Sequence, residues 1–299
     1  MINTGIVGLK NAAPFINAMS ELPEFSFKGI YDPCLLIDRP RQSTFRVFQS
    51  LGDLFNECDT IIFSIDDNLY HPLVCEAIRH SLNVFLVGVH NYQTKELNEL
   101  LTLRDEAGIT LHVGHPFIST GIFKTLQQIC YHPLDVECVI AKNDNTNLVW
   151  LARTELSLML TLMKTSIHRE TVNVYSSFSR MPDSIRVRLD FDNGAVGNIS
   201  INRYGSSPTH IIKAVNYNNI AEADICGGKI TVINSVSPET AENMSVAADQ
   251  YSKLAMQLDS FRICLLNGNE PHSSIENEIR AQLACQRINE KMRINFNVF

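Results

Sequence analysis

Apolar and polar positions form alternating blocks in the first part of the chain. An apolar run from Asp59 to Ile65 leads into the polar break Asp66-Asp67-Asn68, an amphipathic stretch from about Tyr70 to Ser81 and a second apolar run from Asn83 to Val87. Strand, loop, helix and strand in this order make a βαβ unit. Neither apolar run alternates with polar residues, which is typical of parallel strands covered on both faces.

The same strand–helix alternation extends from Thr4 to Val113. It predicts further strands and helices, with Gly108 as a helix cap. The strands are Thr4–Gly8, Phe25–Tyr31, Phe45–Gln49 and Ile109–Val113, and the helices are Pro14–Leu22, Leu51–Cys58 and Thr94–Ala107. Regular alternation indicates an α/β fold with a doubly wound parallel sheet of the Rossmann type. We assign this dinucleotide-binding fold to residues 1–117.

The pattern changes after Gly114-His115-Pro116. Strand-like runs now follow one another, with Asp192-Asn193-Gly194 and Gly227-Gly228 as turns. Strands are predicted at Asp135–Ala141, Val172–Ser179, Ser184–Phe191, Ala195–Tyr204, His210–Asn216, Ala221–Ile225 and Lys229–Ile233, and helices at Gly121–Cys130, Leu148–Met163, Ala247–Leu266 and Ile275–Lys291. Residues 118–299 are therefore expected to form an α+β domain with a mostly antiparallel, open sheet.

Composition narrows the class of protein. The chain has 299 residues, of which 45% are hydrophobic and 19% charged, and a formal net charge of -7. These values are ordinary for a soluble globular protein, and an acidic chain without a basic block argues against nucleic acid as a partner. Neither a signal peptide nor a run of membrane-spanning length is evident. We expect a cytoplasmic protein with no membrane partner.

The eight cysteines are scattered and form no Cys-x-x-Cys pair. Several of them, such as Cys75 and Cys264, lie inside apolar runs. This distribution predicts buried free thiols in a reducing compartment. No metal site can be identified from the sequence.

The turn after the first strand has some features of a dinucleotide site. In Gly8-Leu9-Lys10-Asn11-Ala12-Ala13, Gly8 permits a tight turn and Ala13 permits close helix packing. Lys10 replaces the glycine that lets the backbone approach a phosphate, although its ammonium could pair with that phosphate. The other interpretation is an ordinary strand-to-helix turn.

Asp32, at the end of the second strand, suits a carboxylate that accepts hydrogen bonds from an adenosine ribose. That role favours NAD over NADP, because the carboxylate would repel a 2′-phosphate. The nearby Arg39 and Arg41 keep NADP open. An aspartate that merely opens an Asp-Pro turn is the alternative.

Ligands of doubly wound sheets bind outside the carboxyl ends of the strands. The residues that follow the two strands of the βαβ unit therefore lie at the mouth of any site. These residues are Asp66, Asp67, Asn68, Gly88, Val89 and His90. The mouth holds no lysine.

Taken together, these motifs resemble the Gfo/Idh/MocA family of sugar and cyclitol oxidoreductases over essentially the whole length. Ile65-Asp66-Asp67-Asn68-Leu69-Tyr70-His71 resembles the family's Thr-Pro-Asn-x-x-His signature, and Asn83–Val87 resembles the strand before its Glu-Lys-Pro motif. The Gly8 turn, Tyr31-Asp32, Gly114-His115 and the turns in the second half match in order and spacing, as does Leu258–Pro271.

The resemblance implies a nicotinamide cofactor, NAD or NADP, and a sugar-like or polyol substrate. It also implies a homodimer or tetramer formed through the C-terminal sheet. The implied cofactor-binding residues are Gly8, Leu9, Lys10, Asn11, Asp32, Asp66, Asn68, His71 and Gly88. A histidine in the position of His71 commonly starts a helix near the cofactor edge.

Two catalytic signatures of the family are missing. Glu-Lys-Pro, whose lysine hydrogen-bonds the reacting hydroxyl, is replaced by Gly88-Val89-His90. The family's His-x-x-Asp signature should fall within Leu151–Leu158, where the ionisable residues are Arg153 and Glu155. The chain therefore lacks the groups that the family uses to move the hydroxyl proton.

Four other residues are candidates to replace these groups. His90 and His115 lie at strand ends, and a histidine can act as a general base near neutral pH. Arg153 or Glu155 could orient a polar substrate. The alternatives are an exposed loop histidine for His90, a packed histidine for His115, and the polar side of an apolar helix for Arg153 and Glu155.

Two hypotheses follow. The first is an NAD(P)-dependent oxidoreductase with substituted catalytic residues. The second is a catalytically inactive relative, without need of a cofactor, that serves as a ligand-binding or assembly protein.

Overall fold

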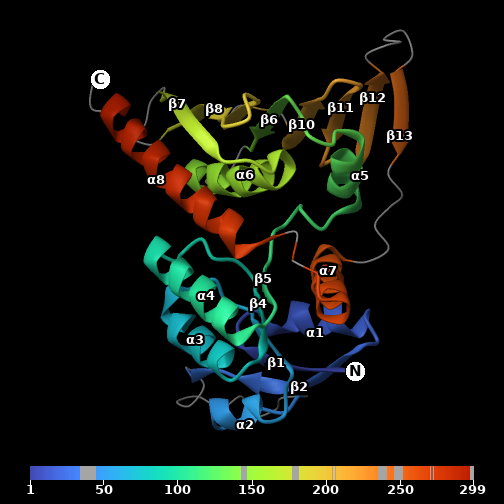
Figure 1. The fold of residues 1–299 in the computed structure, drawn as a ribbon, viewed down its shortest axis with the longest axis vertical. Helices are drawn as coiled ribbons and strands as arrows, with labels where there is room; N and C mark the ends of the chain where they lie inside the picture. The colour runs from blue at the N-terminus through green and yellow to red at the C-terminus, as the bar shows by residue number, and fades with distance from the viewer. Residues whose placement is uncertain are drawn as a thin grey trace. The chain divides into compact units, whose positions relative to one another are not determined.

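The computed structural model describes residues 1–33, 45–142, 147–176, 182–203, 205, 207–234, 241–245, 252–269, 271 and 273–296. The chain divides into two compact units (Figure 1). The first contains Met1–Ser119 and Asp249–Ile279, and the second contains Thr120–Ala248 and Arg280–Phe299. The sequence placed everything after residue 117 in a second domain, so Asp249–Ile279 departs from that prediction.

The first unit contains a five-stranded sheet in the order β2-β1-β3-β4-β5, and every neighbouring pair is parallel. The strands are β1 (Ile2–Val7), β2 (Phe25–Tyr31), β3 (Thr60–Phe63), β4 (Asn83–Leu86) and β5 (Leu111–Val113). All residues of β3 and β5 are buried, as expected of parallel strands with helices on both faces. The predicted doubly wound sheet is confirmed.

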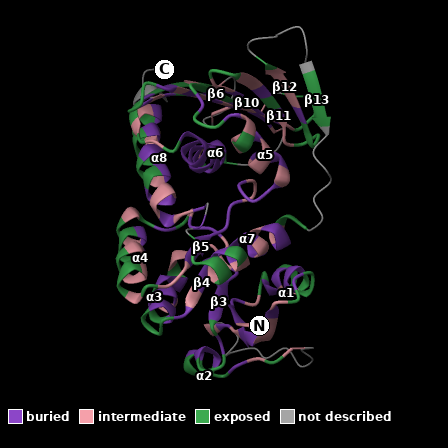
Figure 2. Ribbon diagram, turned by 45° about the vertical axis from the view of Figure 1, so that its right-hand side comes forward, coloured by how far each residue is buried: buried purple, intermediate pink, exposed green. Residues whose placement is uncertain are grey.

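Helices cover both faces of this sheet, and successive strand residues point to opposite faces. Ile6, Ile62 and Phe85 pack in the cluster that contains α1 (Ala12–Ser20) and α7 (Lys253–Asn267). Their neighbours in sequence pack in the cluster that contains α2 (Leu51–Phe55), α3 (His71–Arg79) and α4 (Thr94–Ala107). The sheet is thus the middle layer of three (Figure 2).

Helix α7 belongs to the first unit because its apolar face packs on that unit's core. Phe261 is fully buried, with its ring centroid 5.6 Å from that of Phe85. Arg262 also pairs with Glu24 at 2.9 Å. The helix begins later than predicted, at Lys253, because the Ser252 side chain accepts the Ala255 N–H as an N-cap. Residues 247–251 of the predicted helix lie outside the described residues.

The second unit contains an eight-stranded sheet in the order β13-β12-β11-β10-β6-β9-β8-β7, and only β6–β9 among its described pairs is parallel. The strands are β6 (Asp135–Ala141), β7 (Ile167–Tyr175), β8 (Ser184–Phe191), β9 (Val196–Asn202), β10 (Thr209–Val215), β11 (Asn219–Asp224), β12 (Lys229–Asn234) and β13 (Ala241–Ser245). The predicted α+β class with a mostly antiparallel sheet is confirmed.

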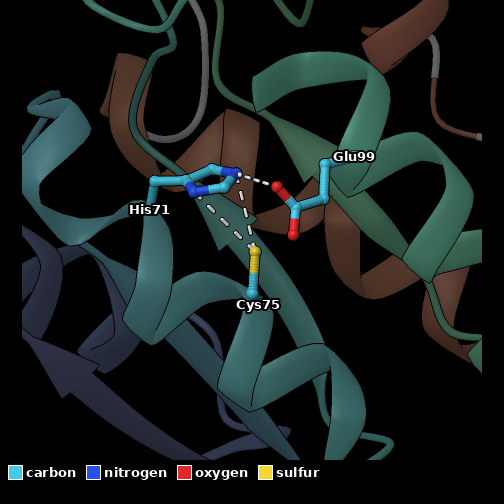
Figure 3. Close-up of side chains that lie close together, drawn as sticks. All are labelled: His71, Cys75 and Glu99. Carbon is cyan, nitrogen blue, oxygen red and sulfur yellow. Dashed lines mark hydrogen bonds and ion pairs between the residues drawn. The ribbon is translucent and has the colours of Figure 1, made fainter. Parts of the chain in front are cut away.

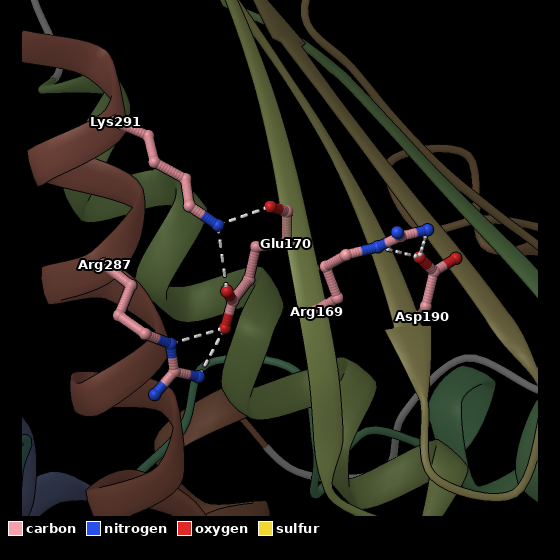
Figure 4. Close-up of polar contacts among 5 residues, drawn as sticks. All are labelled: Arg169, Glu170, Asp190, Arg287 and Lys291. Atoms are coloured by element: carbon pink, nitrogen blue, oxygen red, sulfur yellow. Dashed lines mark hydrogen bonds and ion pairs between the residues drawn. The ribbon is translucent and has the colours of Figure 1, made fainter. Parts of the chain in front are cut away.

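Helices α5 (Gly121–Ile129), α6 (Leu148–Met163) and α8 (Ile275–Phe296) accompany this sheet. The strands alternate buried and less buried residues, as in the pattern of β9, so one face is core and the other is open. Residues 280–296 of α8 are fixed to β7 by Arg287 and Lys291, which both bond Glu170 (Figure 4).

One predicted strand is not formed, and one strand of the structure was not predicted. Phe45–Gln49 makes only a single parallel bridge, between Val47 and Ile30. Strand β13 was not predicted, because Ala241–Ser245 reads Ala-Glu-Asn-Met-Ser and lacks an apolar run. Its pairing with β12 makes it an edge strand. Among the described residues, none of the helices combines the length and apolar character needed to cross a bilayer.

Candidate functional site at the carboxyl edge of the parallel sheet

The turn after β1 requires glycine. Gly8 has φ +102°, and a Cβ there would lie 2.7 Å from Ile65 Cδ1 and 2.9 Å from Ser64 Oγ. The Ser64 hydroxyl instead donates to the Gly8 carbonyl at 2.7 Å. The turn is thus held closely against the end of β3.

Helix α1 begins directly after this turn. Asn11 is its N-cap, but the Asn11 side chain makes no capping bond and donates to the Ser64 carbonyl at 3.1 Å. Pro14, in the first turn, has no N–H to satisfy. The positive end of the α1 dipole is therefore not screened by a capping side chain, and the exposed Lys10 lies beside it.

Asp32 holds the same turn from the end of β2. Its Oδ2 accepts the Leu9 N–H at 2.7 Å, and the residue is buried. One carboxylate oxygen therefore stabilises the turn itself. Its contact with a ribose stays a prediction, while Arg39 and Arg41 lie outside the described residues.

Asp66, after β3, is the centre of a hydrogen-bond network with the loop after β4. Its Oδ2 lies 3.0 Å from His90 Nδ1 and accepts the His90 N–H at 3.1 Å. The Asn91 side chain donates to the Asp66 carbonyl at 2.6 Å. Burial alone would raise the pKa of Asp66, but the His90 contacts and the Asn91 N–H hold that pKa below its ordinary value. Asp66 is therefore a carboxylate at neutral pH.

His90 is not the exposed loop histidine of the alternative interpretation. Its side chain is 15% exposed and its ring is oriented by Asp66. Gly88 lies within this network, because a Cβ there would come 3.0 Å from Asp66 Oδ2 and 3.3 Å from His90 Nδ1. The carboxyl ends of β3 and β4 thus form a compact carboxylate–imidazole pair.

The polar break after β3 also starts the next helix. Asp67 caps a 3-10 turn, Asn68–Tyr70, by accepting the Leu69 N–H at 2.9 Å. Asn68 is half-buried in this turn. Its contact with a cofactor stays a prediction.

Val89, in the position of the family's lysine, is not at the mouth. It is fully buried and belongs to the hydrophobic cluster on the α3–α4 face of the sheet, together with Tyr92 and Leu97. The expectation that this valine lines a site is therefore wrong. The chain turns after β4 so that Val89 enters the core while His90 meets Asp66.

His71 is the first residue of α3, and its side chain faces α4. The ring's Nε2 is 3.5 Å from Cys75 Sγ on the same helix and 3.7 Å from Glu99 Oε2 on α4 (Figure 3). Burial, with a contribution from Glu99, raises the pKa of Cys75 to about 11. The sequence predicted Cys75 only as a buried thiol and did not single out Glu99; the His-x-x-x-Cys spacing on one helix was the available signal for the pair.

His115, after β5, caps its own loop. Its Nδ1 accepts the N–H groups of Phe117 at 3.2 Å and Ile118 at 3.3 Å. The residue is buried, and its ring contacts that of Phe117. Because Nδ1 accepts, the ring proton is on Nε2.

Arg153 and Glu155 belong to α6 of the second unit. Both are buried, so the polar positions of this helix do not face solvent. Glu155 Oε2 lies 3.1 Å from Nε2 of His210, a buried residue of β10 that the sequence did not single out. Burial and the nearby Glu155 raise the pKa of Cys138. Glu155 is therefore part of a buried polar cluster inside the second unit.

The two units together define the fold of Gfo/Idh/MocA-type dehydrogenases, which confirms the fold that the sequence motifs resemble. UDP-N-acetylglucosamine 3-dehydrogenase from Acidithiobacillus ferrooxidans superposes with a TM-score of 0.83 at 15% identity, covering 99% of each chain.

Two further structures match over most of their length. An NAD-binding oxidoreductase from Klebsiella pneumoniae has a TM-score of 0.81 at 13% identity and covers 97% of this chain and 96% of its own. An oxidoreductase from Agrobacterium radiobacter, in complex with NAD+, L-tartaric acid and magnesium, has a TM-score of 0.78 at 12% identity, with the same coverage of 97% and 96%. The sequence matches no family model and no curated protein.

Proposed function

We propose that the chain is an NAD-dependent oxidoreductase that acts on a sugar-like or polyol alcohol, with His90 in place of the family's lysine. The carboxylate–imidazole pair Asp66–His90, at the carboxyl edge where doubly wound sheets bind ligands, is the observation that carries the proposal. The fold it shares with an NAD-binding oxidoreductase and with a sugar-nucleotide dehydrogenase supports the substrate class.

The residues of the Gly8 turn fit a dinucleotide. The absence of a Cβ at Gly8, the uncapped start of α1 and the ammonium of Lys10 together suit a pyrophosphate. Leu9 and Asn11 complete the turn, and Asp32 favours NAD over NADP. A bound nicotinamide supplies the hydride acceptor for oxidation of the alcohol.

In this proposal His90 accepts the proton of the reacting hydroxyl. Asp66 holds Nδ1, so the proton is taken up at Nε2, while the hydride leaves the carbon that carries the hydroxyl. The carboxylate fixes the ring orientation and stabilises the imidazolium that forms. Asp66 is thus a positioning residue, and His90 is the general base.

The test measures turnover with NAD+ over a panel of sugars and inositols. His90→Gln is expected to lower kcat by about a hundredfold or more while NADH affinity changes little. Asp66→Asn should lower kcat less and alter its pH profile, because the ring loses its charged partner. His168→Gln, which changes a histidine with a 73% exposed side chain on β7, is the matched control. Equal kcat in His90→Gln and the control would contradict the assignment of the base.

The second candidate is a catalytically inactive relative that serves as a ligand-binding or assembly protein. The structure of α6 favours this second candidate, because Glu155 is paired with His210 in the buried interior. This candidate predicts that the wild-type protein binds cofactor or sugar without turnover on any member of the panel. Turnover that depends on His90 would exclude it.

We also propose that copies of the chain associate through the open face of the eight-stranded sheet. That face presents polar side chains around a hollow of about 410 Å³, lined among others by Glu137, Arg186 and Arg188. Opposite charges on one face allow two copies to pair. Light scattering should give a dimer or tetramer for the wild type and smaller species for Arg186→Glu. A wild-type monomer would contradict the proposal.

A further inference from the structure

Three potential metal ligands meet between α3 and α4, outside the site proposed above. His71 and Cys75 are one helical turn apart on α3, and Glu99 approaches from α4 (Figure 3). The ligand atoms of the three side chains all lie within 4.8 Å of one another. His71 and Cys75 are buried, whereas the Glu99 side chain is 46% exposed and leaves the cluster reachable from solvent.

Two of the three ligand–ligand distances are close to those of tetrahedral coordination. Zinc bonds of about 2.3 Å to sulfur, 2.0–2.1 Å to nitrogen and 2.0–2.2 Å to oxygen place tetrahedral ligands about 3.3–3.7 Å apart. Here Cys75 Sγ and His71 Nε2 are 3.5 Å apart. His71 Nε2 and Glu99 Oε2 are 3.7 Å apart. Small side-chain adjustments would bring the three atoms around one ion.

The arrangement differs from a nucleophile–base–carboxylate triad. In a triad the thiol and the carboxylate contact opposite nitrogens of the imidazole. Here the carboxylate lies 3.7 Å from Nε2 of His71, and the thiol lies beside both nitrogens, 3.5 Å from Nε2 and 3.9 Å from Nδ1, rather than opposite the carboxylate (Figure 3). Convergence of an imidazole nitrogen, a sulfur and a carboxylate oxygen on one point is what a metal ion requires.

Arg79 orients the carboxylate from outside. Its guanidinium lies 3.6 Å from Glu99 Oε1, while Glu99 Oε2 faces the imidazole. Such outer contacts commonly fix metal-binding carboxylates. The donor set of one thiolate, one imidazole and one carboxylate favours Zn²⁺ over Mg²⁺ or Ca²⁺, which prefer oxygen.

We propose that His71, Cys75 and Glu99 bind a zinc ion that links α3 to α4, with water as the fourth ligand. The site is separate from the Asp66–His90 pair, so a failure of the oxidoreductase proposal leaves it standing. The ion would join two helices that cover one face of the parallel sheet.

The test uses the purified, metal-free full chain. Titration with Co²⁺ should give the ultraviolet band of a cobalt–thiolate bond and the visible bands of a tetrahedral site, at one equivalent. Zn²⁺ should displace the cobalt and raise the Tm. Cys75→Ser should abolish the thiolate band, and Glu99→Gln should weaken zinc binding at least about tenfold. Glu99→Gln changes a partly exposed side chain, so its fold should persist.

Matched controls separate this site from adventitious binding. Cys226→Ser removes an exposed thiol, and His80→Gln removes an exposed histidine just after α3; neither should alter metal affinity. Absence of the thiolate band in the wild type would overturn the proposal. So would equal zinc affinity in the wild type, Cys75→Ser and Glu99→Gln.

Discussion

Two regions of the molecule hold a histidine beside a carboxylate, and their surroundings differ. Asp66–His90 lies in loops at the carboxyl edge of the parallel sheet, with side chains 22% and 15% exposed. Glu155–His210 joins α6 to β10, with side chains 1% and 7% exposed. The distances, 3.0 and 3.1 Å, are nearly equal. The two pairs therefore share their geometry and differ in solvent access, and Asp66–His90 is the more accessible of the two.

We expect the largest loss of stability at Val89, which precedes His90 in sequence but is fully buried. Val89→Lys would place an ammonium in the hydrophobic cluster on the α3–α4 face, and we expect a loss of about 4 kcal/mol or more in the free energy of unfolding and no gain of activity. Urea denaturation measures this loss. Val87→Lys, at a half-buried position two residues earlier in the chain, is the control and should cost clearly less. A stable Val89→Lys protein with new turnover would show that residue 89 faces the site.

Removing the carboxylate of the buried pair should have the next largest effect. Glu155→Ala takes away the His210 partner and leaves a cavity, so we expect a loss of about 2–3 kcal/mol. Glu290→Ala, at an exposed position of α8, should change stability by less than about 0.5 kcal/mol. If the two variants unfold at the same urea concentration, the Glu155–His210 pair does not contribute to the stability of the second unit.

A smaller effect is expected where α8 meets β7. Burial raises the pKa of Glu170, but Arg287 and Lys291 outweigh it and lower the pKa below the ordinary value. A lowered carboxyl pKa stabilises the fold above the unfolded pKa, and this stabilisation is lost as pH falls through the folded pKa. Glu170→Gln should therefore cost about 1.5 kcal/mol at neutral pH and progressively less in acid.

The neighbouring pair Arg169–Asp190 is a more exposed ion pair with which Glu170 can be compared (Figure 4). The Arg169 side chain is 70% exposed, so solvent screens the pair. At neutral pH, Asp190→Asn should change the unfolding free energy less than Glu170→Gln. A larger loss of stability in Asp190→Asn than in Glu170→Gln would contradict the conclusion that Glu170 fixes α8 to β7.

Local sequence patterns predicted most of the elements, because their signals are local. Thr94–Ala107 with its Gly108 cap and Leu148–Met163 agree with the structure at both ends. The helix α7 was predicted, but its place in the first unit was not, because sequence order does not show that its apolar face packs on α1. The sequence did not predict strand β13, because its formation depends on pairing with β12.

The candidate site was predictable in its location but not in its contacts. The rule for parallel sheets placed Asp66, Gly88 and His90 at one edge, where the structure brings them together. It could not show that Val89 turns into the core or that His115 caps its own loop. The pairing of Glu155 with His210 joins residues far apart in sequence, so no spacing reveals it.

The proposed function requires that the Gly8 turn binds a dinucleotide, and calorimetric titration with NADH measures this binding. Gly8→Ala places a Cβ against Ile65 and Ser64, whereas Gly52→Ala in α2 places one in open space. Circular dichroism first confirms that both variants fold. We predict one-to-one binding to the wild type and to Gly52→Ala, and at least about tenfold weaker binding to Gly8→Ala. No binding of NADH to the wild type at about 1 mM, the upper range of ordinary KM values, would contradict the account.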